Sequence, residues 1–125
     1  MTTKSLADYD RAIQLDPNDA IAYHIRGHAK SALGKKKEAI ADYDRAIQLD
    51  SNFAPAYSNR GVAKSALGKN QDAIADYDRA IQLDSNNAMA YYNRGNAKSS
   101  LGKKEDAIKD YTEAIQIDSN VRIQV

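Results

Sequence analysis

Hydrophobic residues recur at helical spacing along nearly the whole chain. In the N-terminal segment, Leu6, Tyr9 and Ile13 stand at i, i+3 and i+7, which places them on one face of an amphipathic α-helix. This spacing predicts a helix over roughly residues 5–15, and Pro17 marks its end because the residue before a proline is pushed out of the α region. Equivalent patterns predict helices over roughly 37–49, 71–83 and 105–117, and each of these follows another helix that ends at a Leu-Gly pair.

The chain also repeats itself every 34 residues. Arg-Gly pairs stand at 26–27, 60–61 and 94–95, and Leu-Gly pairs stand at 33–34, 67–68 and 101–102. We divide the chain into a partial unit at 1–19, three full units at 20–53, 54–87 and 88–121, and the start of a truncated fourth unit at 122–125. The glycines of the Leu-Gly pairs are expected to take the left-handed conformation that ends many helices.

A 34-residue unit with two helical patterns and a glycine-marked turn resembles the tetratricopeptide repeat (TPR). In the central unit, the aromatic, glycine and alanine positions of that family hold Tyr57, Gly61, Ala73, Tyr77 and Ala80. Ser85 replaces the proline that usually follows the second helix, and only the partial unit keeps it, as Pro17. The resemblance implies an all-α fold, a right-handed superhelical solenoid of antiparallel helix pairs with seven helices. It also implies a non-catalytic protein–protein interaction scaffold that binds a peptide or helix in its concave groove.

Composition narrows the functional classes. The chain has 18 Lys and Arg against 17 Asp and Glu, a net charge of +1. This charge is too close to neutral for a nucleic-acid-binding protein. The chain has no cysteine, and we find no nucleophile–base pair, phosphate-binding loop or paired carboxylates, so neither an enzyme nor a cofactor is predicted. The N-terminus lacks the apolar stretch of a signal peptide, and no segment approaches a membrane span. We therefore expect a cytoplasmic protein that binds neither nucleic acid nor membrane.

The three full units differ mainly at positions two, five, six and nine of the first helix. Positions two, five and nine share one helix face, and in proteins of the family that this chain resembles, that face lines the groove. The functional interpretation is a groove that offers different chemistry along its length, whereas the alternative is sequence drift on an exposed surface. The predicted peptide-groove residues are Ile21, His24, His28, Ser58, Asn59, Val62, Met89, Tyr92, Asn93 and Asn96.

Two more specific sites are disfavoured by the same residues. Some TPR domains grip a C-terminal carboxylate with Lys, Asn, Asn, Lys and Arg at five groove positions. Those positions hold His24, His28, Asn59, Met89 and Asn93 here, and only Asn59 fits. His24 and His28 could share a metal ion at i, i+4, but no third ligand is suggested nearby, so no metal site is predicted.

Three expectations concern packing. Gly27, Gly61 and Gly95 lie inside helices, where glycine costs about 1 kcal/mol against alanine, so their use implies close helix contact. The Asp-Ser-Asn segments at 50–52 and 84–86 are expected to supply side-chain acceptors for the next helix start. A guanidinium group that lies between packed helices needs a carboxylate partner. The sequence therefore predicts a ladder of ion pairs. Its members are Arg26, Arg60 and Arg94 with Asp42, Asp76 and Asp110, in a pairing register that the sequence leaves open.

The two ends of the solenoid carry apolar residues without an obvious neighbour. We expect end-to-end or two-fold packing between chains, because exposed apolar stripes tend to be buried by association. The predicted self-association residues are Leu6, Tyr9, Ile13, Ile108, Tyr111 and Ile115. They support the alternative function, a self-assembling structural or engineered repeat module without a dedicated ligand.

Overall fold

The computed structural model describes residues 3–119, which form seven helices and no strand. The helices are α1 (Thr3–Leu15), α2 (Ala20–Ala32), α3 (Lys36–Leu49), α4 (Ala54–Ala66), α5 (Asn70–Leu83), α6 (Ala88–Ser100) and α7 (Lys104–Ile117). The four helix ranges predicted from hydrophobic spacing are confirmed to within two residues at each end. The expected start of a further unit at 122–125 lies outside the described residues.

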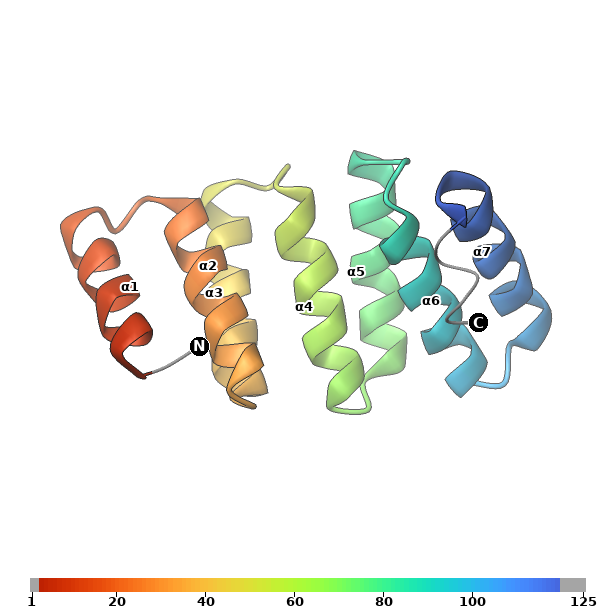
Figure 1. Cartoon of the computed structure of the whole chain (residues 1–125), viewed down its shortest axis with the longest axis horizontal. Coiled ribbons are helices and arrows are strands. Elements are labelled where there is room, and N and C mark those ends of the chain that lie inside the picture. The colour runs from red at the N-terminus through yellow and green to blue at the C-terminus, as the bar shows by residue number, and fades with distance from the viewer. Residues whose placement is uncertain (1–2, 120–125) are drawn as a thin grey trace.

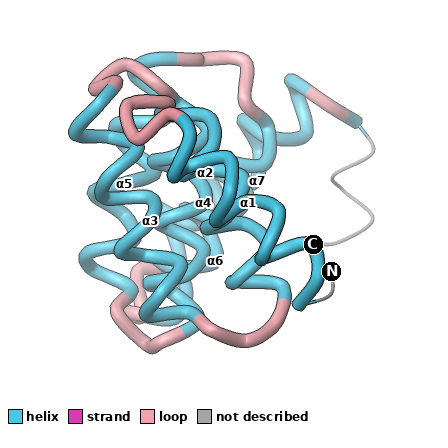
Figure 2. The backbone as a smooth tube through the Cα atoms, turned by 90° about the vertical axis from the view of Figure 1, so that its left-hand side faces the viewer, coloured by secondary structure: helices cyan, strands magenta, loops and turns pink. Residues whose placement is uncertain are grey.

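The helix pairs stand side by side in a row, with α3 behind α2 in this view, and neighbours along the chain run antiparallel (Figure 1). α2 packs on α3, α4 on α5 and α6 on α7, and these pairs are joined in turn by contacts of α3 with α4 and of α5 with α6. Seen along the row, the loops gather at the two ends of the helices (Figure 2). The right-handed solenoid of antiparallel helix pairs expected from the sequence is confirmed.

Each helix pair turns at a left-handed glycine. Gly34 has φ 83°, a backbone conformation that favours glycine because it has no Cβ. Its N–H donates to Ser31 O at 3.0 Å, and the N–H of Lys35 donates to Lys30 O at 2.9 Å, the pattern of a Schellman motif. The equivalent glycines at 68 and 102 have φ 79° and 82°, so the sequence expectation is confirmed at all three turns.

Glycines inside the first helices allow the two helices of a pair to approach closely. A Cβ built on Gly61 would lie 2.6 Å from Cε1 of Tyr77, and Tyr77 is only 2% exposed. Gly27 and Gly95 face Tyr43 and Tyr111 in the same way. The predicted close contact is confirmed, and its partner is a tyrosine ring of the second helix.

The predicted helix caps were wrong at the Asp-Ser-Asn segments. Asp50 follows the last residue of α3, and its carboxylate accepts from the N–H of Asn52 at 3.1 Å, within the loop. α4 begins after Phe53, without a side-chain cap. The residue in the same position before α6 is Asn87, which does accept from Ala90 N at 3.1 Å. The aspartate therefore closes the turn, because it lies three residues too early to reach the free N–H groups of the next helix.

No helix within the described part of the chain is both long enough and apolar enough to span a membrane.

Candidate functional site

The predicted groove residues lie on α2, α4 and α6, and these helices form the inner side of the row. α2 contacts α4 and α4 contacts α6, whereas among the described helices α3 does not contact α5 and α5 does not contact α7. A curved row brings together the helices on its inside and separates those on its outside. We call the solvent-facing surface of α2, α4 and α6 the inner face, and it carries Ile21, His24, Ile25, His28, Ser58, Asn59, Val62, Met89, Tyr92, Asn93 and Asn96.

Large apolar side chains are exposed along the whole inner face. Ile21 is 58% exposed on α2, Val62 is 40% exposed on α4 and Met89 is 47% exposed on α6. Ile25, at 39%, belongs to the same surface although the predicted set left it out. Its signal was its place in a column that differs between the units. His28 and Asn96 are also exposed, and the other predicted groove residues are partly buried.

Three inner-face side chains are held by hydrogen bonds within the chain, two of them to each other and one to α7. Nδ2 of Asn59 lies 2.8 Å from Nε2 of His24, a bond that joins α2 to α4 across the inner face. An amide nitrogen only donates, so the neutral imidazole accepts this bond. Burial lowers the pKa of His24, and the neighbouring His28 lowers it further. The hydroxyl of Tyr111 donates to Oδ1 of Asn96 at 2.6 Å.

Tyr92 has a structural role beside its place on the inner face. It packs against the buried pair Ala88 and Ala114, and its ring lies 5.7 Å from that of Tyr111. The half-buried ring therefore supports the α6–α7 pair as well as facing the groove.

The arginines of α2, α4 and α6 point towards the second helices and away from the inner face. We call this packed region between first and second helices the layer. Arg60 donates from Nε and Nη2 to both oxygens of Asp76, at 2.9 and 2.7 Å, and from Nη1 to Asp44 at 2.9 Å. Arg26 binds Asp42 and Asp10, and Arg94 binds Asp110 and Asp78, at the same distances. The predicted ladder is confirmed, and each arginine bridges the carboxylate of its own pair and one on the preceding second helix.

The lysines of the inner helices join the same ladder. Lys64 lies 3.2 Å from Asp76, and Lys30 and Lys98 approach the equivalent carboxylates at 3.5 and 3.1 Å. Hydrogen bonds to Asp76 raise the pKa of Arg60 above its ordinary range. Each of α2, α4 and α6 has one Arg, one Lys and no acidic residue. Every fixed charge of these helices is therefore paired with a second helix, and His24 and His28 are the basic side chains left on the inner face.

The predicted self-association residues fall on differently covered surfaces. Leu6 and Ile13 are each 9% exposed and pack towards α2, the one described helix that α1 contacts. Ile108 is 61% exposed on α7, and Leu15 is 73% exposed at the end of α1. Tyr9, Tyr111 and Ile115 are partly exposed. An association surface at the N-terminal end would therefore use residues other than Leu6 and Ile13.

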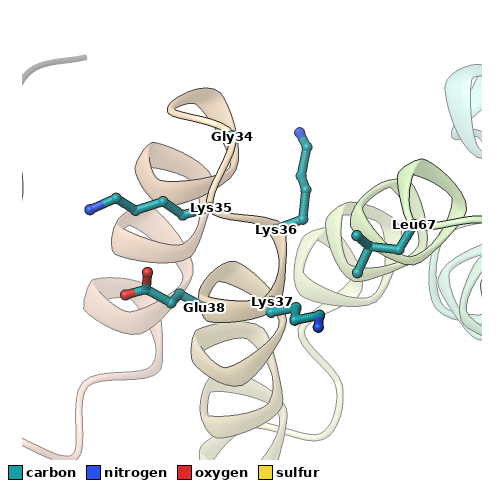
Figure 3. Close-up of a pocket in the computed structure, with 6 residues that line it drawn as sticks. All are labelled: Gly34, Lys35, Lys36, Lys37, Glu38 and Leu67. Atoms are coloured by element: carbon teal, nitrogen blue, oxygen red, sulfur yellow. The ribbon is translucent and has the colours of Figure 1, made fainter.

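An open pocket of about 310 Å³ lies apart from the inner face, at the turn between α2 and α3 (Figure 3). Lys36, one of the lining residues, donates from Nζ to the carbonyl and hydroxyl oxygens of Ser31, at 3.0 Å each. None of the predicted groove residues lines this pocket. Among the residues described, no group of three or more His, Cys, Asp or Glu side chains could hold a metal ion.

Sequence models of known families identify the repeated unit. A TPR repeat model matches residues 27–68 and 64–102, and tetratricopeptide repeat models match residues 8–41 and 88–121. The chain belongs to the tetratricopeptide repeat family. No curated protein matches it by sequence.

Solved TPR structures share the fold over most of the chain. The crystal structure of MamA is 26% identical with a TM-score of 0.88, over 98% of this chain and 71% of that chain. The second TPR of Spaghetti (RPAP3), bound to the HSP90 peptide SRMEEVD, is 32% identical with a TM-score of 0.78, over 79% and 92%. YrrB, a TPR protein with an unusual peptide-binding site, is 25% identical with a TM-score of 0.83, over 90% of this chain and 58% of that chain.

Proposed function

We propose that this TPR chain is a non-catalytic interaction scaffold whose inner face binds an uncharged peptide segment with apolar side chains. One observation carries the proposal: the inner face exposes Ile21, Val62 and Met89, while the Arg and Lys of the same helices are bound to carboxylates in the layer behind. Burying apolar area is worth about 25 cal/mol per Å², so at least one exposed apolar side chain on each inner helix offers an anchor point.

Polar groups between these anchors suit a peptide backbone. Ser58 and Asn93 are partly accessible, and His28 and Asn96 are exposed. Their hydroxyl, amide and imidazole groups both donate and accept hydrogen bonds without bringing a fixed charge. A neutral ligand therefore loses little on leaving water, whereas an isolated carboxylate in this groove would find no arginine or lysine to pair with.

This chemistry differs from that required by the acidic peptide bound to the RPAP3 domain. The peptide SRMEEVD contains two glutamates and ends in an aspartate. The five positions at which family members grip a C-terminal carboxylate include His24, Met89 and Asn93 here, and the nearby cations are engaged in the ladder. We therefore propose that acidic C-terminal peptides are not the ligands of this chain.

A phage-displayed library of random dodecamers, panned against the full chain, tests the ligand chemistry. Enriched sequences should be rich in apolar and neutral polar residues and depleted in Asp and Glu relative to the input. A second panning uses the triple variant Ile21→Ser, Val62→Ser and Met89→Ser, which should lose the enriched set. A matched control, Leu15→Ser with Ile108→Ser, removes exposed apolar residues elsewhere and should retain it. Enrichment of acidic C-termini, or equal recovery on the triple variant, would overturn the proposal.

The exposed apolar side chain of Ile108 favours a second candidate, a self-assembling module that needs no dedicated ligand. α7 ends the described row, and no described helix covers that side chain. Sedimentation across a concentration series would reveal assembly, and Ile108→Glu should abolish it. A chain that stays monomeric at high concentration contradicts this candidate.

A further inference from the structure

Two neighbouring boundaries along the inner face differ in one polar contact. Where α2 meets α4, Nδ2 of Asn59 lies 2.8 Å from Nε2 of His24, which stands 35 residues earlier. Where α4 meets α6, the same positions hold Ser58 and Asn93, and no hydrogen bond joins these two described residues. The chain therefore carries one boundary with the contact and one without it.

Two aromatic rings hold the imidazole of His24 in place. The ring of Phe53, just before α4, meets it edge-on with the centroids 5.0 Å apart, and the buried ring of Tyr43 lies at 5.7 Å. Before α6, the position of Phe53 is taken by Asn87, which caps that helix instead. His24, Phe53 and Asn59 therefore occur together at one boundary, where the imidazole is fixed against the amide.

The bond to His24 determines which way the amide of Asn59 faces. Its nitrogen donates to the neutral imidazole, so the carbonyl oxygen Oδ1 lies on the other side of the amide. Among the described residues, none donates a hydrogen bond to Oδ1 of Asn59. Since no buried side-chain nitrogen or oxygen of these residues lacks a partner, Oδ1 is open to solvent. The amide therefore offers the groove a hydrogen-bond acceptor.

We propose that His24 is a positioning residue for ligand recognition: its neutral imidazole holds Asn59 with Oδ1 towards the groove, and this oxygen selects a ligand that donates an N–H. A backbone N–H of a peptide is such a donor. Ile21 and Val62 each stand three residues from one member of the pair, so the acceptor lies between two apolar anchors. This inference rests on the proposed function and adds the hydrogen bond that the site reads.

A proton on His24 reverses the amide. An imidazolium donates from both ring nitrogens and accepts no hydrogen bond, so Nδ2 of Asn59 no longer has an acceptor there. The amide turns over, Oδ1 accepts from Nε2–H, and Nδ2 faces the groove. The groove then presents a donor where the ligand needs an acceptor, so the affinity for the ligand should fall.

The charged groups on the helices around His24 are engaged with other groups. α2 contacts α1, α3 and α4. Arg45 of α3 lies over the ring of Tyr23, and Lys36 of α3 donates to Ser31. The ion pairs around α2 join Arg26, Lys30, Arg60 and Lys64 to Asp10, Glu38, Asp42, Asp44 and Asp76.

The groups in contact with the imidazole favour its neutral form. Burial lowers the pKa of His24, the charge of His28 lowers it further, and the carbonyl of Pro55 raises it by less. Tyr43 stays neutral beside the ring, because burial raises its pKa to about 12. His24 therefore accepts the bond from Asn59 at neutral pH and takes up a proton below pH 6.5.

Nuclear magnetic resonance of the ligand-free full chain tests the positioning directly. The side-chain amide signals of Asn59 should shift between pH 7.5 and pH 5.0 with the same midpoint as the imidazole of His24. The amide signals of Asn93, whose neighbour is Ser58, should not follow that midpoint. An Asn59 amide that does not follow the titration of His24 overturns the inference, whether or not the chain binds a peptide.

Fluorescence anisotropy tests the consequence for binding. The probe is a rhodamine-labelled dodecamer that is enriched on the full chain at pH 7.5 and contains no His, Asp or Glu. Its affinity should fall about fivefold from pH 7.5 to pH 5.0, the loss expected for one hydrogen bond. Methylating one of its backbone nitrogens should cost the same factor at pH 7.5 and little at pH 5.0. If no dodecamer is enriched, the proposed function fails, and the amide titration alone decides this inference.

Variants of His24 separate positioning from support of the fold. His24→Ala removes the acceptor and should lower the affinity about fivefold at pH 7.5, without a further fall at pH 5.0. His24→Gln restores an oxygen that accepts from Asn59, so it should recover most of that loss and stay independent of pH. His28→Gln should keep the fall in affinity but move its midpoint to higher pH, because the charge that lowers the pKa of His24 is gone. Equal losses with His24→Ala and His24→Gln, or a pH dependence that survives in both, would overturn the inference.

Discussion

Two regions of the molecule differ in how much their residues vary between units, although α2, α4 and α6 contribute to both. One is the packed layer between first and second helices, and the other is the inner face. In the layer, the three units carry the same residues, such as Arg60, Gly61, Asp76 and Tyr77 of the central unit. On the inner face, the positions of Ser58 and its equivalents hold three different residue types. A residue in the layer must fit partners in its own unit and in the preceding one, so it is the same in each unit. A residue on the inner face meets mostly solvent and is free to vary.

Removing the central carboxylate of the ladder should have the largest effect on stability. Asp76 is 4% exposed and holds both Arg60 and Lys64. Asp76→Ala should lower the free energy of unfolding by about 3 kcal/mol, because it leaves Lys64 without its carboxylate and Arg60 with only the half-exposed Asp44. Urea denaturation measures the loss.

Arg60→Leu is the matched variant for the same ion pair. It should cost less than Asp76→Ala, because Asp76 keeps Lys64 and the half-exposed Asp44 returns to water. If both variants leave the unfolding midpoint unchanged, the arginine head is solvated and the ladder contributes nothing.

Overfilling the close helix contact should come next in size. Gly61→Leu places a side chain where even a Cβ would stand 2.6 Å from the buried ring of Tyr77, and should cost about 2 kcal/mol. The neighbouring Val62→Leu, on the exposed inner face, should change stability by less than about 0.5 kcal/mol. Thermal and urea unfolding of the two variants compare these positions directly, and equal losses would contradict a tight layer beside a free face.

A smaller effect on stability is expected from pH, through His24, whose hydrogen bond with Asn59 joins α2 to α4. The folded pKa of His24 lies below the ordinary value of 6.5, first because of burial and then because of His28. The unfolded chain therefore binds more protons in this range, and stability that is complete above pH 6.5 should fall as the pH drops through the folded pKa. Urea midpoints between pH 8 and pH 5 measure this dependence. His24→Gln should flatten it, and His28→Gln should reduce it less, because burial of His24, the larger cause, remains. A slope that survives His24→Gln would assign it to other groups.

The layer could be predicted from the sequence because it depends on local rules that repeat. Helical spacing located the helices, Leu-Gly pairs located the left-handed turns, and a buried charge at a fixed interval implied a ladder. The pairing register could not be predicted, because Asp44 and Asp76 lie 16 residues on either side of Arg60 and only the crossing geometry shows that it binds both.

The inner face was harder to predict in detail. Its position followed from the columns that differ between units, but the bond between His24 and Asn59 depends on two helices that are separate in the sequence. Tyr92 also differs from its equivalents, yet it packs on Ala88 and Ala114 and so belongs partly to the core. A difference between units therefore does not by itself show that a side chain is exposed.

The central claim is that the exposed apolar side chains of the inner face, Ile21, Val62 and Met89, bind ligand without supporting the fold. The most direct measurement is calorimetric titration of a library-selected peptide into the chain and into the variant Ile21→Ser, Val62→Ser and Met89→Ser, with urea unfolding of both proteins. The account predicts at least about a tenfold loss of affinity, as expected when anchor residues are removed, with an unfolding free energy that changes by less than about 1 kcal/mol. Unchanged affinity, or a loss of affinity that only accompanies a collapse in stability, would contradict it.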